Sequence, residues 1–293
     1  MNTHNSPIPA RPARIRRTAA PPLVLILAMP ALLLLVLPIL PVIPMSFTAG
    51  QVVEFPPSAW GLNAYRELFA DAGWRQAIVF SLKVAALAVL LSVVTATLAA
   101  IGLPRLRSRG EGLIAAVILA PLAMPVVVLA LGTFQFFIQI KLNGTLIGIA
   151  IAHGVLGVPF VFLTVRAALS KLDVSLVRSA MSLGAGTWSV LRWVYLPAIL
   201  PALLSGALLV FVVSFDEVVI SLFISGPGAI TFPVKLFTEV QFNLSPAIMA
   251  VSTLLLAAVV LVVVIGIALF GARRTVYRVA LGDRAQTERR NES

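Results

Sequence analysis

Of the chain's 293 residues, 60% are hydrophobic and 11% are charged, which excludes an ordinary soluble domain, where roughly a quarter of the residues carry charge. The formal net charge of +11 does not indicate nucleic-acid binding, because the basic residues flank apolar blocks and form no patch interleaved with aromatic residues. The sequence has no cysteine, so disulfides, thiolate metal sites and cysteine nucleophiles are excluded.

The first apolar block runs from about residue 22 to residue 47 and follows a basic tail, residues 1–21, that contains four arginines. This block is longer than the roughly 7–15 apolar residues of a signal peptide and has no clear small-residue cleavage site. We therefore expect an uncleaved membrane anchor. Several prolines within the block, at positions 30, 38, 41 and 44, predict a kinked helix.

Five further apolar blocks are long enough to cross a bilayer as tilted helices, since about 20 residues suffice. They cover approximately residues 77–103, 113–139, 145–167, 197–224 and 247–271. The sequence therefore predicts an all-α, polytopic membrane protein with six transmembrane helices in a single domain, residues 22–271. A second basic tail follows at 272–293.

The positions of lysine and arginine predict the side of the membrane that each connection faces. Of the 22 basic residues, 17 lie in the two tails, after the second span and after the fourth span. Because cytoplasmic segments carry the excess of Lys and Arg, we expect both termini in the cytoplasm and the connection 48–76 on the opposite side. Within that connection, Leu62, Tyr65, Leu68 and Phe69 recur at helical spacing, which predicts a surface helix.

The cytoplasmic segment 169–196 is too polar to span the membrane and predicts a helix, a sharp turn and a second helix. The first helix has an apolar stripe formed by Leu169, Leu172, Leu176, Ala180 and Leu183. We expect Asp173 to cap this helix, Gly184 to end it in the left-handed conformation and Thr187 to cap the second helix, before Pro197 starts the fifth span. Such a knob fits helix-in-groove docking onto a soluble partner, although an interfacial helix pair that only covers the bundle would have the same periodicity.

This segment resembles the coupling loop of the permeases of binding-protein-dependent ABC importers, where the letters EAA, three residues, a glycine and later I-x-L-P follow one another. The coupling residues that the resemblance implies are Arg178, Ser179, Ala180, Gly184, Ala185, Leu196 and Pro197. Val194 replaces the usual isoleucine, and only the third letter of the first triplet matches. Arg178 stands in place of the family's acidic residue, which reverses a charge at the expected ATPase contact.

The resemblance extends from the first span to the last and is closest to the polyamine permeases of the spermidine and putrescine type. Its strongest part is SFDEVVISLFISGPG at 214–228, and MPVVVLALG at 124–132 is also similar. It implies a candidate substrate pathway that contains Ser214, Phe215, Asp216 and Glu217. Adjacent helical positions differ by about 100°, so at most one of the two carboxylates is expected to face a pathway squarely. In the structural alternative, one acid pairs with Lys83 or with a group on a partner permease.

The resemblance also implies the type I fold of ABC importer permeases, a bacterial inner-membrane location and a defined set of partners. These partners are a second permease, identical or different, two cytoplasmic ATPase subunits, an extracytoplasmic solute-binding protein and membrane lipid. The chain has no G-x-x-x-x-G-K-[ST] motif, so ATP would be bound by a partner subunit and we expect no cofactor in the chain itself.

Enzymatic activity is not expected. His153, Asp216 and Glu217 are the only plausible catalytic groups, and the sequence assembles no nucleophile or metal constellation around them. A lone histidine in an apolar span, such as His153, is more often a satisfied packing residue. Two transport alternatives remain open: a permease for another small organic solute, and an ion-coupled secondary transporter, which would favour inverted halves and broken helices.

Overall fold

The computed structural model describes residues 28–30, 33–105, 108–242, 245–261 and 264–265. Within these ranges the regular structure is helical, with two isolated β-bridges and no strand. The predicted all-α fold class is therefore confirmed for the part of the chain that is described.

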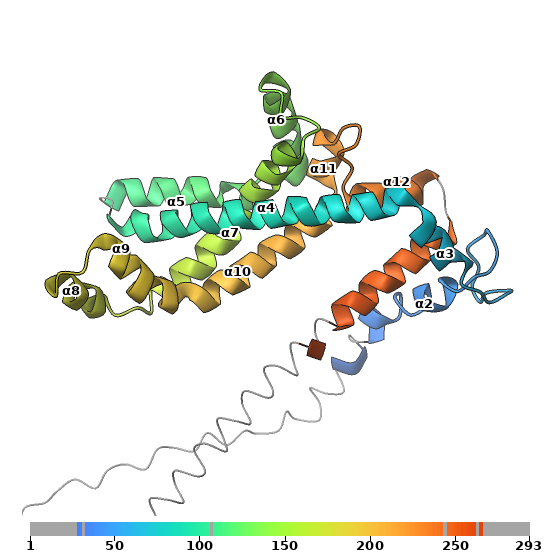
Figure 1. Ribbon diagram of the computed structural model, residues 1–293, viewed down its shortest axis with the longest axis horizontal. Helices are drawn as coiled ribbons and strands as arrows, with labels where there is room; N and C mark the ends of the chain where they lie inside the picture. Colours follow the sequence, from blue (N-terminus) through green and yellow to red (C-terminus); the bar gives the residue numbers. More distant parts are fainter. Residues whose placement is uncertain (1–27, 31–32, 106–107, 243–244, 262–263, 266–293) are drawn as a thin grey trace, which may run out of the picture.

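Three helices form the centre of the bundle: α4 (Ala72–Gly102), α7 (Leu146–Leu169) and α10 (Leu196–Asp216). They pack side by side (Figure 1), and each is part of a helix that is long and apolar enough to cross a membrane. The short η1 (Leu103–Arg105) connects α4 towards α5 (Ser108–Ala123), which packs against α7. Apolar side chains packed between these helices form the core.

The predicted third span, 113–139, is not one continuous helix. The structure divides it into α5 and α6 (Val126–Gln139), and the axes of residues 110–123 and 126–139 differ by 107°. Pro125 explains the break, because it has no N–H to donate and because its ring disfavours the helical conformation of the preceding residue. Beyond the break, α6 packs against α11 (Val219–Ile224) instead of continuing along α4 (Figure 1).

The predicted fifth span, 197–224, is wrong at both ends. At its start, α9 (Thr187–Val190), the π-helical η2 (Leu191–Tyr195) and α10 run on as one helix. The wider π-helical turn precedes Pro197, whose ring would clash with the carbonyl four residues earlier in a regular α-helix. At its end, the helix stops at Asp216, and α11 begins after a two-residue break.

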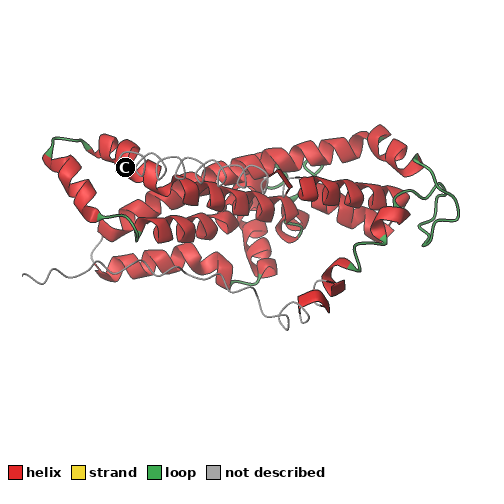
Figure 2. Ribbon diagram, turned by 90° about the horizontal axis from the view of Figure 1, so that it is seen from below, coloured by secondary structure: helices red, strands yellow, loops and turns green. Residues whose placement is uncertain are grey.

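The segments expected on opposite sides of the membrane lie at opposite ends of the molecule. One end is formed by α8 (Val174–Ser182) and α9, and the other by α2 (Val42–Met45) and α3 (Asn63–Ala70) (Figures 1 and 2). The predicted surface helix is confirmed as α3. The helix α12 (Phe232–Phe242) packs near the start of α4.

The first and last predicted spans lie partly outside the described residues, and both basic tails lie entirely outside them. Between residues 33 and 47 the chain forms short helical stretches and turns, consistent with interruption by its prolines. The last span begins with a helix, Pro246–Leu261. Among the described residues, three helices meet the length and composition for a span, or four with the bent pair, so six spans stay a prediction.

Candidate functional site

The candidate coupling element begins with α8, whose two ends form as expected. The Asp173 carboxylate accepts a hydrogen bond from the Ser175 N–H at 2.8 Å, and this bond lowers the pKa of Asp173 below its ordinary value. At the other end, Gly184 has φ +84°. The Ala185 N–H donates to the Ala180 carbonyl and the Gly184 N–H donates to the Met181 carbonyl, both at 3.0 Å. These two bonds form a Schellman motif. Both end signals predicted for this helix are therefore confirmed.

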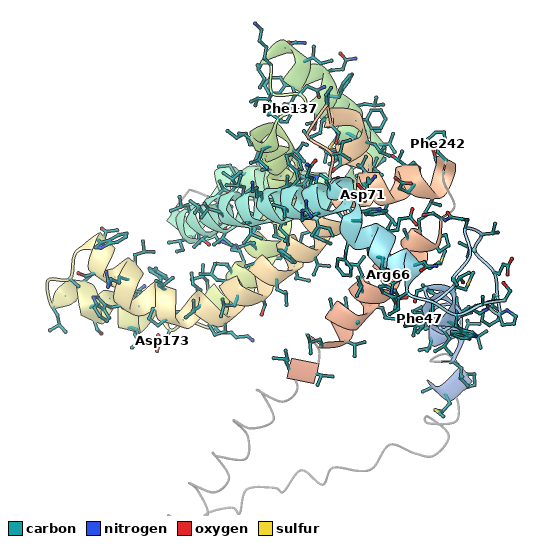
Figure 3. The ribbon with its side chains drawn as sticks, turned by 45° about the vertical axis from the view of Figure 1, so that its right-hand side comes forward. Phe47, Arg66, Asp71, Phe137, Asp173 and Phe242 are labelled. Atoms are coloured by element: carbon teal, nitrogen blue, oxygen red, sulfur yellow. The ribbon has the colours of Figure 1, made fainter. Side chains whose placement is uncertain are left out.

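The turn after α8 is exposed in the part of the chain that the structure describes. Leu176, Leu183 and Trp188 are 55%, 88% and 71% exposed, and Arg178 and Ser179 are also exposed. Large apolar side chains in this position are unfavourable in water unless a partner covers them. Figure 3 places Asp173 at this end of the molecule, away from Asp71.

The second helix of the element differs from the prediction. Thr187 is the first residue of α9 and does not cap it, because the N-cap position is occupied by Gly186 and no side chain bonds there. Leu196 and Pro197 lie in the first turn of α10, within a helix of 30 residues that runs from Thr187 to Asp216. At a rise of about 1.5 Å per residue, this helix spans about 45 Å and joins the two candidate sites directly.

The two adjacent carboxylates of the candidate pathway have different surroundings. The Glu217 carboxylate accepts a hydrogen bond from the Ile220 N–H at 2.9 Å, so Glu217, one residue before the N-cap Val218, satisfies an N–H group in the first turn of α11. Asp216 is the last residue of α10 and is exposed. Neither acid forms an ion pair within the described residues, so the predicted alternative pairing with Lys83 is not present in this subunit.

Asp216 ends a stripe of exposed apolar residues on α10. The stripe consists of Leu200, Leu204, Leu208 and Val212, spaced by four residues. Four-residue spacing keeps side chains on one face of a helix. A carboxylate that faces lipid at mid-depth costs roughly 2.5–3.5 kcal/mol on insertion scales. We therefore expect the face of α10 at Asp216 to contact another protein surface or water.

The remaining two residues of the candidate pathway, Phe215 and Ser214, make contacts within the subunit. Phe215 stacks on Phe211 and on Phe232 of α12, with ring centroids 5.9 and 5.7 Å apart. Ser214 is buried and bonds to His153 at 2.9 Å. Of the four candidates, Asp216 is therefore the one whose polar group has no partner among the described residues, while the others support the structure around it.

Sequence reasoning treated His153 as a packing residue and did not connect it with the pathway. The structure places it between Ser214 of α10 and Ser221 of α11, with one ring nitrogen bonded to each hydroxyl. The spacing of the two serines, seven residues or about two helical turns, is a sequence signal that could have found them on one face.

A separate cavity of about 510 Å³ lies beside the start of α4 and does not include Asp216. Arg75, Lys83 and Lys235 line part of it, which makes its wall basic. Lys235 contacts Glu239 at 2.8 Å and Asp71 at 3.5 Å. Burial alone would lower the pKa of Lys235, but these carboxylates outweigh it and raise the pKa above its ordinary value.

Comparison with known proteins gives consistent results. Residues 88–276 match the family described as binding-protein-dependent transport system inner membrane component. The chain is 36% identical over 209 residues to the putrescine transport system permease protein PotI of Escherichia coli strain K12, covering 69% of this chain and 74% of that protein. It is 30% identical over 203 residues to the spermidine/putrescine transport system permease protein PotC of Haemophilus influenzae, covering 69% and 79%.

The fold is also found among solved structures. A crystal structure of a bacterial ABC transporter involved in the import of the acidic polysaccharide alginate contains a chain that superposes with a TM-score of 0.67. The alignment covers 82% of this chain and 94% of the other at 20% sequence identity. At this identity, the likeness concerns the fold alone.

Proposed function

Because the chain belongs to the family of binding-protein-dependent transport system inner membrane components, we propose that it forms, together with a second permease, the pathway by which a polyamine such as putrescine or spermidine is imported. The family consists of transport components and not of enzymes, in agreement with the sequence prediction. The likeness to the putrescine and spermidine/putrescine permeases supports the substrate class.

The observation that carries the proposal is the exposed carboxylate of Asp216 at the end of an otherwise apolar stripe. A polyamine is a flexible polycation, and a single carboxylate on an apolar wall attracts such a solute without holding it tightly. Weak attraction favours passage, because a solute that binds strongly at one point leaves it slowly. High affinity is then a property of the extracytoplasmic binding protein.

The proposed partners follow from the two ends of the molecule. Two ATPase subunits bind ATP and dock on the exposed element around α8 and Gly184, and the chain itself carries no cofactor. The continuous helix Thr187–Asp216 carries movement from that element to Asp216 as a rigid body. We propose that Arg178 faces an acidic residue of the ATPase, which Arg178→Glu would test through weaker co-purification of the two subunits.

Uptake of labelled solutes tests the proposed function. A strain that lacks its own polyamine uptake should accumulate labelled putrescine or spermidine when it expresses this chain with its partner subunits, and should not do so when this chain alone is omitted. An unrelated labelled amino acid serves as the control solute. Equal uptake with and without the chain would contradict the proposal.

The same assay separates the two transport alternatives. Import driven by the ATPases should stop when cellular ATP is depleted, even if the membrane potential is maintained. Uptake that follows the membrane potential and ignores ATP would favour an ion-coupled secondary transporter. Uptake of another small organic solute in place of polyamines would keep the importer assignment and change its substrate.

A further inference from the structure

His153 forms a hydrogen-bonded bridge to two helices, α10 and α11, which are separated by the helix break at Glu217. It lies on α7 and is 1% exposed. Its Nδ1 lies 2.9 Å from the hydroxyl of Ser214 on α10, and its Nε2 lies 3.0 Å from the hydroxyl of Ser221 on α11. A neutral imidazole has one donor and one acceptor, and each serine hydroxyl serves either role, so both ring nitrogens are satisfied in either tautomer.

The break that this bridge spans is not caused by proline or glycine. Residues 208–224 contain neither proline nor glycine, which are the usual causes of a sharp interruption in a helix. Side-chain hydrogen bonds are found at the break instead. The Glu217 carboxylate accepts from the Ile220 N–H, and His153 bonds to one serine hydroxyl on each side of the break. A local bond to Glu217 and a tertiary bridge from His153 therefore maintain the break together.

The bridge belongs to a polar layer between two apolar clusters. One cluster contains Val161 and Val210, and the other contains Ile149 and Ile220. The layer consists of Ser92, His153, Ser214 and Ser221, and the Ser92 hydroxyl donates to the Gly154 carbonyl at 2.9 Å. Hydrogen bonds have directional requirements that apolar packing lacks, so this layer sets the position of α10 and α11 relative to α7.

Asp216 is two residues from Ser214 and ends α10 at the break. A continuous helix would rotate the following residues by about 100° each and would carry α11 away from its contacts with α6. The direction in which the Asp216 carboxylate projects therefore depends on the geometry that the bridge maintains.

We propose that His153 is a positioning residue for the pathway: through Ser214 and Ser221 it holds the break between α10 and α11 in the geometry that presents Asp216 to the solute. The inference rests on the proposed function for the role of Asp216, whereas the geometry of the bridge is independent of which solute is carried. Two measurements separate these parts.

The first measurement reports geometry alone. Because the chain has no cysteine, spin labels at Leu208→Cys and Leu222→Cys, both exposed positions on either side of the break, report the distance across it in a complex assembled from cysteine-free partners. We expect the distance distribution to broaden or shift in His153→Ala and, to a smaller extent, in Ser221→Ala, which removes one hydroxyl. Thr95→Val is the control, since Thr95 is exposed and bonds to a carbonyl of its own helix, α4. An unchanged distribution in both bridge variants would overturn the proposal.

The second measurement reports transport. His153→Ala is expected to reduce polyamine uptake roughly tenfold, since it removes two hydrogen bonds. His153→Gln, which keeps a donor and an acceptor, should restore part of the uptake.

A double variant tests whether His153 acts through Asp216. If it does, Asp216→Asn should lower uptake little further in a His153→Ala background. Fully additive losses, with the complex assembled, would mean that His153 does not act through Asp216. Absence of polyamine uptake by the unmodified complex would refute the proposed function and leave the spin-label result to decide the bridge.

Discussion

Asp216 and Glu217 are neighbours in sequence but do different work in the structure. The Glu217 carboxylate accepts a hydrogen bond from the first turn of α11, whereas Asp216 is exposed at the end of α10. The expectation that at most one of them faces a pathway agrees with this division. The two residues should therefore respond differently to the same chemical change.

We predict that Asp216→Asn lowers polyamine uptake several-fold without loss of the protein from the membrane. The amide keeps the shape of the side chain and removes the charge that attracts a cation. Uptake of labelled spermidine, corrected for the amount of assembled complex, measures the effect. Glu217→Gln is the matched control: it keeps an oxygen acceptor for the Ile220 N–H, so its uptake should stay close to normal. Normal uptake in Asp216→Asn would reject the pathway role.

A second residue-scale prediction concerns Gly184. At φ +84°, a β-branched side chain is strained by about 1–2 kcal/mol, and no atom would contact an added Cβ, so the effect is one of backbone conformation alone. Gly184→Val should insert normally but lose ATPase co-purification and transport. Gly186→Val, the same substitution at φ −69° with equally open surroundings, should retain most of both. If Gly184→Val keeps its ATPase, the turn is not the docking element.

At the scale of the elements, the close approach of α7 and α10 depends on small residues. A Cβ at Gly206 of α10 would lie 2.7 Å from the Thr164 hydroxyl and 3.1 Å from the Val161 Cα, both on α7. Small residues allow helix backbones to approach in membranes, where packing and not the hydrophobic effect drives association. The contact between these two helices is therefore sensitive to one methyl group.

We predict that Gly206→Ala destabilises the assembled permease by about 1–3 kcal/mol, the usual cost of overpacking. Thermal unfolding of the purified complex in detergent would show a lower midpoint. Gly132→Ala in α6 is the control, because nothing lies within 4 Å of its added Cβ, and alanine is the better helix former by about 1 kcal/mol. Equal unfolding midpoints for Gly206→Ala and the unmodified protein would contradict the prediction, because they would mean that α7 and α10 accommodate the added methyl group without loss of stability.

At the scale of the whole molecule, the two ends to which the proposal gives different functions lie far apart. The exposed element around α8 lies at one end, and α3 with the start of α4 lies at the other. The charge bias assigns the first end to the cytoplasm, since it includes the basic segments after the second and fourth spans. The ion pair between Arg166 and Glu111, 2.7 Å long, joins α7 and α5 towards the same end.

Labelling of single cysteines tests this orientation. We predict that Ser108→Cys is protected from an impermeant thiol reagent in intact cells and reacts after the membrane is opened. Asp71→Cys, near the opposite end, should react in intact cells. The absence of natural cysteines makes each signal specific to the introduced residue. Reaction of Ser108→Cys in intact cells would reverse the assigned topology.

The sequence by itself determined the features that depend on composition and on local signals. Apolar length and charge bias identified α4 and α7 as spans, and short-range signals at Asp173 and Gly184 predicted both ends of α8, because caps and left-handed turns involve residues only a few positions apart. The turn of the candidate coupling element could thus be predicted almost entirely.

Only the tertiary structure decided where the apolar blocks break and which carboxylate is free. The 197–224 block has no proline or glycine near residue 217, and the break there depends not only on the local bond from Ile220 to Glu217 but also on His153, which is more than 60 residues away in sequence. The 113–139 block was expected as one span; Pro125 is a local cause of its break, and the contact of α6 with α11 directs the helix beyond it. Apolar periodicity in a membrane does not specify partners, because lipid and protein neighbours are equally apolar; long-range polar contacts make that choice.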